Sequence, residues 1–162
     1  MSGASSWSLG EREAHRIHEI LRGLLRESGA RSALLVDRAG QLVAQTGEAP
    51  TFDPTAFASL TAADFSANDQ LARMLGEQEF GALFHQGERE SMYLADVARR
   101  VILVVLFDNR TTLGLVKLRV RGTVGTLAEV FTSMFASGAE PPRMADGFVG
   151  EAEDEIDRLF GK

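Results

Sequence analysis

The sequence predicts a single mixed α/β (α+β) domain whose elements follow the order helix, two strands, helix, three strands, helix. Three observations support this prediction. The length of 162 residues is about that of one domain. Hydrophobic residues (44%) and charged residues (25%) occur in the proportions typical of globular chains. Long segments with helical spacing alternate with short apolar segments that turn residues separate.

The first predicted helix runs from Leu9 to Ser28. Ser8 and Glu11 are three residues apart and form a capping-box pattern at its start. Gly29 is placed to end the helix. The apolar residues recur at steps of three and four, which puts them on one helix face: Ile17, Ile20, Leu21, Leu24 and Leu25.

Five short segments are predicted as strands. Residues 33–36 and 42–44 form a tight hairpin in which Gly40 takes a positive φ. Three more strands follow at hairpin distance, at 82–86, 91–97 and 101–107. The last of these is apolar at both alternations, which predicts a strand buried on both faces near the middle of the sheet.

The second predicted helix begins with Asp53 as N-cap and Pro54 in the first turn, and it extends to Gly76. Its middle, residues 61–70, is small or polar except for Phe65. Such a surface suits the close approach of another helix or chain.

A third helix is predicted after Thr111 or Thr112, either of which can serve as N-cap. Residues 116–121 also alternate like a strand, but the helical spacing persists for more than twenty residues and therefore prevails. We accordingly expect a disordered N-terminus over 1–8, the folded domain over 9–136, a flexible linker over 137–150, and a short acidic tail or helix over 151–162.

Composition argues against several classes of function. Seventeen Lys and Arg against 23 Asp and Glu give a net charge of −6, the wrong sign for a nucleic-acid-binding protein. The longest apolar run, 101–107, is far shorter than the ~20 residues of a transmembrane helix, so no direct membrane insertion is expected. The N-terminus lacks the pattern of a signal peptide, and we expect a cytoplasmic protein.

No catalytic constellation is apparent. The chain has no cysteine, no phosphate-binding loop motif and no nucleophile elbow. His15 and His18 lack a third ligand in the sequence nearby, and His85 stands alone. We therefore predict no catalytic residues, no metal and no cofactor.

Several segments carry a family resemblance. The most specific are residues 34–42 (LLVDRAGQL), 104–114 (VVLFDNRTTLG) and 155–160 (EIDRLF), and residues 60–62, 75–80 and 84–87 extend the match. On these segments, residues 10–135 resemble the roadblock family. Within that family the chain is most similar to the bacterial members that act on a Ras-like small GTPase.

The resemblance implies a roadblock-like αββαβββα fold, a five-stranded antiparallel sheet with helices on both faces. It also implies a homodimer whose sheets join across a two-fold axis, with the two copies of the second helix forming a platform for one GTPase. Two chains would then act on each GTPase as a GTPase-activating protein in cell polarity or motility, in the cytoplasm and concentrated at a cell pole. The hydrolytic groups and Mg²⁺ would belong to the GTPase.

The resemblance also places the partner-binding residues. On the second helix these are Asp64, Phe65, Ser66, Asn68, Asp69, Gln70 and Arg73. A second contact is placed on the C-terminal tail, at Ile156, Leu159 and Phe160.

Three alternatives stay open. An arginine finger could act from a turn, with Arg110 and Arg89 as candidates, although the resemblance implies activation that repositions the GTPase's own groups. The chain could be a non-catalytic dimeric scaffold or adaptor. It could also be a small-molecule sensor, but the sequence shows no convergent polar groups for a ligand.

Overall fold

The computed structural model describes residues 9–136, so the predicted N-terminus, linker and tail, including Ile156, Leu159 and Phe160, lie outside the described residues. The chain divides into two compact units, residues 1–131 and 132–162. The described residues of the second unit are the last residues of helix α3. The elements are α1 (Glu11–Ser28), β1 (Ser32–Asp37), β2 (Leu42–Gly47), α2 (Pro54–Met74), β3 (Ala82–Gln86), β4 (Ser91–Val97), β5 (Val101–Phe107) and α3 (Leu113–Ala136).

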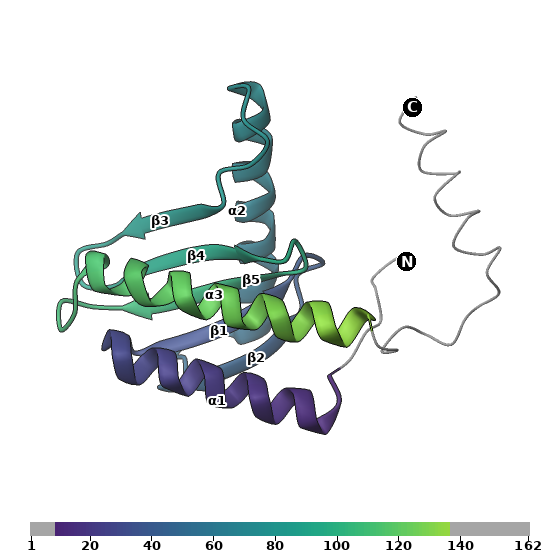
Figure 1. Ribbon diagram of the computed structural model, residues 1–162. Coiled ribbons are helices and arrows are strands. Elements are labelled where there is room, and N and C mark those ends of the chain that lie inside the picture. Colours follow the sequence, from purple (N-terminus) through teal and green to yellow (C-terminus); the bar gives the residue numbers. More distant parts are fainter. Residues whose placement is uncertain (1–8, 137–162) are drawn as a thin grey trace, which may run out of the picture. The chain divides into compact units, whose positions relative to one another are not determined.

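The five strands form one sheet in the order β2-β1-β5-β4-β3, and every neighbouring pair is antiparallel. The prediction that residues 101–107 form a central strand is confirmed, since β5 lies between β1 and β4. Helix α2 covers one face of the sheet, and α1 and α3 lie on the other (Figure 1).

The two faces of the sheet follow from strand alternation. Leu34, Val36, Ile102 and Val104 form a buried cluster with Phe65 of α2. Their neighbours along the strands point the other way, under α1 and α3, because successive side chains alternate between faces. These neighbours are buried as well: Ala33, Leu35, Leu103 and Val105.

Most of the helix ends predicted from the sequence are confirmed. Gly29 ends α1 in the left-handed region (φ 75°), and its N–H donates to the Leu25 carbonyl. The Asp53 carboxylate accepts from the Thr55 N–H at 3.0 Å, and the Thr112 hydroxyl accepts from the Leu115 N–H at 3.2 Å. Within residues 9–136, no helix combines the length and hydropathy needed to cross a membrane.

The predicted capping box at α1 is wrong. The helix begins at Glu11, and its N-cap is Gly10, which has no side chain to accept a hydrogen bond. The acidic side chains of Glu11 and Glu13 instead lie in the first turn, where negative charge favours the positive end of the helix dipole.

The β1–β2 hairpin forms as predicted. The Asp37 carboxylate accepts from the N–H groups of Ala39 and Gln41, at 3.0 and 2.9 Å, and Gly40 has a φ of 94°. A Cβ at Gly40 would also lie 3.2 Å from the Cα of Ser59 in α2. This glycine is therefore required both for the turn and for the close approach of α2.

We expect Gly40→Ala to lower the free energy of unfolding by about 1–3 kcal/mol, because alanine must adopt a strained positive φ against the α2 backbone. Urea denaturation followed by circular dichroism would measure the change. Gly23→Ala in α1 is the matched control: its Cβ would meet nothing closer than 3.7 Å, so this variant should be at least as stable as the parent chain. Equal stability of Gly40→Ala and the parent would contradict the requirement.

Candidate partner-binding site

Helix α2 presents three sides with different chemistry. The side against the sheet carries Ala58, Thr61, Phe65, Asn68 and Ala72, all buried. These positions recur at steps of three and four, as one face of a helix must.

Two of the predicted partner-binding residues lie on this buried side. Phe65 is 1% exposed and belongs to the core cluster, and Asn68 is 6% exposed. Neither offers its side chain at the surface of the described chain. A helix turns by about 100° per residue, so seven positions drawn from the continuous stretch 64–73 cannot all share one surface.

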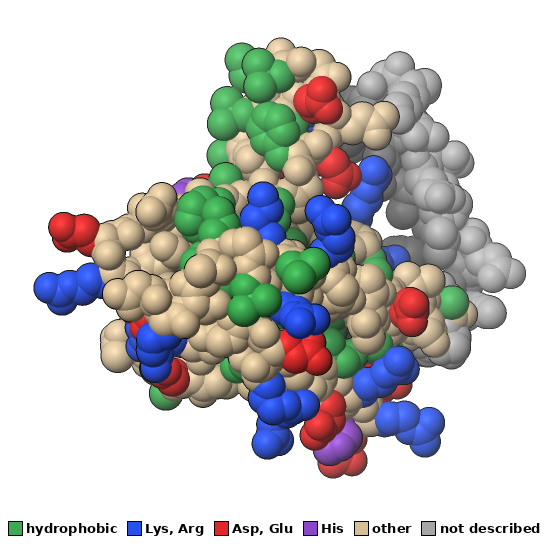
Figure 2. Space-filling view, turned by 60° about the vertical axis from the view of Figure 1, so that its left-hand side comes forward, with side chains coloured by type: hydrophobic (Ala, Val, Ile, Leu, Met, Phe, Trp, Pro, Cys, Tyr) green, Lys and Arg blue, Asp and Glu red, His purple; other side chains and the backbone are tan. Residues whose placement is uncertain are grey.

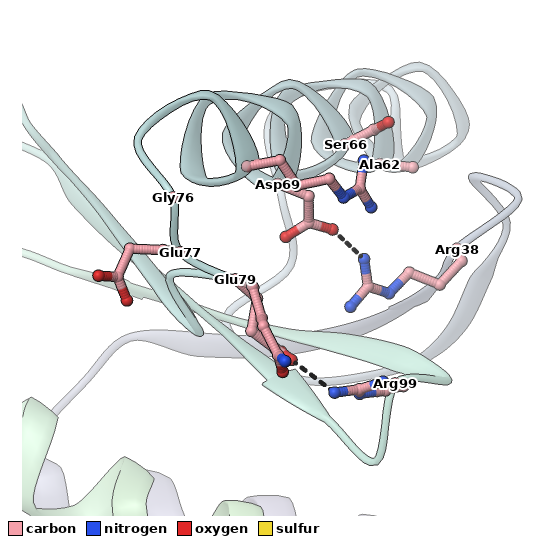
Figure 3. Close-up of a pocket in the computed structure, with 10 residues that line it drawn as sticks. Arg38, Ala62, Ser66, Asp69, Gly76, Glu77, Glu79 and Arg99 are labelled. Atoms are coloured by element: carbon pink, nitrogen blue, oxygen red, sulfur yellow. Dashed lines mark hydrogen bonds and ion pairs between the residues drawn. The ribbon is translucent and has the colours of Figure 1, made fainter.

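Four predicted residues do lie together, and we call them the polar flank of α2: Ser66, Asp69, Gln70 and Arg73. Ser66, Gln70 and Arg73 are exposed, while Asp69 is half-buried. Ser66, Asp69 and Arg73 line one wall of an open groove of about 850 Å³. The other walls are Arg38 in the β1–β2 turn, residues 76–79 after α2, and Arg99 in the β4–β5 turn (Figure 3).

Arg38 anchors the polar flank to the sheet. One guanidinium nitrogen donates to Asp69 at 3.0 Å, another pairs with Asp96 of β4, and the guanidinium lies 5.0 Å from the centre of the Phe65 ring. Burial acts to lower the pKa of Arg38, but the hydrogen bonds to Asp96 and Asp69 outweigh it, and the pKa lies above the ordinary arginine value. Figure 3 shows Arg38 and Asp69 pointing toward one another in the groove.

A second ion pair borders the same groove. Arg99 lies 3.3 Å from Glu79 in the segment that follows α2. Ala98 and Arg99 both have positive φ, at 53° and 57°, a conformation that costs side chains other than glycine about 1–3 kcal/mol. The strained turn places the Arg99 side chain toward the groove (Figure 3).

Asp64 lies apart from the other predicted residues. Its carboxylate is 2.6 Å from the His85 ring of β3, and helical geometry puts it on the side of α2 away from the polar flank. Asp64 therefore joins α2 to the edge strand rather than to the groove.

The third side of α2 is exposed and apolar, and we call it the apolar flank: Leu60, Ala63, Ala67, Leu71 and Met74. Leu60 is 70% exposed, Leu71 56% and Met74 82%. The end of α2 extends beyond β3 in Figure 1, and Figure 2 shows hydrophobic side chains gathered at this end. Exposed apolar surface of this kind marks an interaction site.

Strand β3 adds a second feature beside the apolar flank. It forms one edge of the sheet, so in the described chain it pairs with β4 alone. The other side of β3 offers unpaired backbone groups to a further strand.

The two arginines considered as arginine fingers lie at the opposite end of the sheet from the groove. Arg110 follows the end of β5, where its guanidinium donates to both carboxylate oxygens of Asp108 at 3.0 and 3.1 Å and to Glu48 at 3.3 Å. The hydrogen bond with Asp108, and then that with Glu48, raises the pKa of Arg110. Arg89 lies exposed in the β3–β4 turn at that same end.

A second cavity, of about 530 Å³, has an apolar floor that includes Met92, Leu106 and the stacked rings of Phe52 and Phe57. At its rim, Arg31 pairs with Glu48 and Glu90. His85, which also lines the cavity, pairs with Asp64. Across residues 9–136, no three His, Asp or Glu side chains converge in a group that could hold a metal ion.

The elements define an αββαβββα domain in which one helix, α2, has two exposed flanks of different chemistry. Residues 16–107 match the family model described as Roadblock/LC7 domain. The chain belongs to the Roadblock/LC7 family, which confirms the resemblance carried by residues 34–42 and 104–114.

Solved structures add detail to this assignment. The chain is 42% identical to Myxococcus xanthus MglB, over 73% of this chain and 96% of that one, with a TM-score of 0.70. It is 37% identical to the gliding protein MglB of Thermus thermophilus, over 77% and 95%, with a TM-score of 0.72. A structure described as MglB with tetrameric arrangement gives 37% identity over 77% and 94%, with a TM-score of 0.72. No curated protein matches the chain.

Proposed function

We propose that this chain is a GTPase-activating protein for a bacterial Ras-like small GTPase of the MglA type, and that it acts as a homodimer in cell polarity or motility. The observation that carries the proposal is the polar flank of α2, which is exposed, borders a groove and is held in place by Arg38. The likeness to MglB proteins at 37–42% identity supports the choice of partner.

The homodimer would form through the apolar flank of α2 and the free edge of β3. A two-fold axis beside β3 would set the two copies of α2 side by side and antiparallel, each covering the other's exposed leucines and methionine. The polar flanks would stay outside this contact, since they lie about a third of a turn around each helix from the apolar flank. One GTPase would then bind two chains.

The chain would stimulate hydrolysis by repositioning the GTPase's own groups. Arg38 and Arg99 are engaged in ion pairs in the groove, and Arg110 and Arg89 lie at the far end of the sheet. Arg73 is the positively charged residue of the polar flank, and it would bind a carboxylate or carbonyl group on the surface of the GTPase. Ile156, Leu159 and Phe160, outside the described residues, would supply a second contact.

Single-turnover GTP hydrolysis by the Ras-like GTPase of the same genome tests the proposal. We expect the rate to rise with added protein and to saturate at two chains per GTPase. Binding without any change in rate would make the chain a non-catalytic scaffold or adaptor instead.

Arg110→Ala separates the proposed mechanism from an arginine finger. We expect stimulation to stay within about twofold of the parent, whereas loss of a finger would cost ~10³–10⁵ in rate. The same single-turnover assay gives the rate, and a pull-down with the GTPase confirms binding. Complete loss of stimulation with binding retained would establish the finger.

A further inference from the structure

The outer surface of α3 carries apolar side chains that the fold leaves exposed. Leu118 is 60% exposed and Leu115 36%. Beside them, α1 and α3 enclose a groove of about 320 Å³, to which α3 contributes Leu118, Arg119, Gly122, Thr123 and Thr126, and α1 contributes Glu19, Ile20, Gly23, Leu24 and Glu27. We call the exposed leucines and this groove the α3 groove.

Three glycines interrupt the same side of α3. A Cβ added at Gly114, Gly122 or Gly125 would meet nothing within 4 Å, so packing within the described chain does not require glycine at these positions. Glycine inside a helix costs about 1 kcal/mol relative to alanine. What glycine provides here is room for another backbone to approach closely.

The charges beside the exposed leucines have one sign on α3. Residues 113–128 contain no Asp or Glu. Arg119 lines the groove beside α1, whereas Lys117 and Arg121 line a separate hollow between α3 and strands β3 and β4, so the cations lie on either side of Leu118. In the part of the chain that the structure describes, none of these three cations forms an ion pair. The two acids of the groove, Glu19 and Glu27, belong to the α1 wall. Figure 2 shows Lys and Arg side chains interspersed with hydrophobic ones on the face turned toward the viewer.

We propose that the α3 groove binds an acidic amphipathic helix of another protein. The helix would set leucine-like side chains against Leu115 and Leu118, bring its backbone close over the glycines, and place its carboxylates beside Lys117, Arg119 and Arg121. From Gly114 to Gly125 the surface is about 16 Å long, which accommodates three turns of a helix.

This site lies on the opposite face of the sheet from α2 (Figure 1). It is independent of the proposed GTPase contact, and a partner on α3 would leave both flanks of α2 free. Loss of GTPase binding would therefore not affect the inference, and loss of helix binding would leave the proposed function intact.

Fluorescence anisotropy with the full-length chain tests the proposal. The probe is a fluorescein-labelled helical peptide of about 18 residues, or five turns, with leucine at steps of three and four and glutamate elsewhere; the control peptide has lysine in place of each glutamate. We expect saturable binding of the glutamate peptide alone. Leu118→Glu should weaken binding of the glutamate peptide at least tenfold. The control is Leu42→Glu on β2, which should leave this binding unchanged; Leu42 is exposed to the same extent as Leu115, at 36%.

A glycine variant distinguishes docking from a purely structural role. Gly122→Ala should raise the thermal midpoint of the free chain, because alanine favours the helix, and yet weaken the peptide, because its methyl group holds the partner backbone away. A role within the fold alone would not reduce peptide binding. Thermal melts of each variant confirm that it is folded.

Four results would overturn the proposal. They are equal binding of both peptides, unchanged binding by Leu118→Glu, displacement of the peptide by vesicles containing anionic lipid, and tighter peptide binding by the full chain with Phe160→Glu. The third would assign the surface to a membrane. The fourth would assign the groove to the chain's own acidic C-terminal segment.

Discussion

Ser66→Arg should abolish docking of the GTPase while the chain stays folded and dimeric. Ser66 is exposed at the N-terminal end of the polar flank and lines the groove with Arg38 and Arg73. Arginine would fill the groove with a long side chain and add a further cation there. A bulky charged side chain in a groove that a partner must enter is poorly tolerated, and we expect the dissociation constant to rise by about 100-fold or more.

Isothermal titration calorimetry with the GTP-loaded GTPase gives the affinity of this variant. Ser66→Ala is the matched control, since it keeps the position small and should bind within about threefold of the parent. Intact binding by Ser66→Arg would remove the polar flank from the site. Loss of secondary structure in the variant, checked by circular dichroism, is not expected because the side chain is exposed to solvent.

Leu71→Asp should convert the proposed dimer to monomers. Leu71 is 56% exposed on the apolar flank, so an aspartate is well solvated in a single chain. In the proposed dimer the same carboxylate would be buried against a second α2 with no partner, which costs several kcal/mol. We expect the dimer dissociation constant to rise by at least ~100-fold.

Analytical ultracentrifugation measures this change, and the matched control is Leu118→Asp. Leu118 is exposed to a similar extent, at 60%, but on α3 at the other face of the sheet, so that variant should remain dimeric. Because one GTPase would contact both copies, stimulation of hydrolysis should fall together with dimerisation. A Leu71→Asp chain that stays dimeric would exclude the apolar flank from the contact between copies.

Most elements of the fold could be predicted because their signals are local. The apolar run 101–107 indicated that β5 lies at the centre of the sheet, and Asp53 with Pro54 marked the start of α2. The hairpin turn could be predicted from Asp37 and Gly40, which lie three positions apart. Each of these features depends on neighbours along the chain, which a single sequence displays directly.

The sides of α2 were harder to assign because polar residues are buried beside Phe65 and large apolar residues are exposed. The helix buries Thr61 and Asn68 against the sheet and exposes Leu60, Leu71 and Met74 to solvent. Amphipathic periodicity, applied to one chain, expects these polar residues to be exposed and these apolar residues to be buried. The exposure of these apolar residues is explained if a second surface covers them, and the sequence of one chain does not display that surface.

Arg38 could not be selected as a site residue from the sequence. Its partners Asp69 and Asp96 lie 31 and 58 residues away, and Phe65 is also remote along the chain. In the sequence, Arg38 is only one residue of the turn 37–40, and nothing near it indicates these contacts. Long-range ion pairs of this kind arise from the packing of α2 across the hairpin end, which only the tertiary structure specifies.

The contacts of Arg38 also have a mechanical consequence. A helix packed on a sheet can rotate about its own axis. Rotation of α2 would separate Arg38 from Asp69 and would also move the Phe65 ring away from the Arg38 guanidinium. The contacts of Arg38 with Asp69 and Phe65 therefore fix the rotation of α2 about its own axis. The direction in which each flank faces relative to the sheet is therefore set in advance, so a protein bound at one flank has a fixed orientation relative to a protein bound at the other.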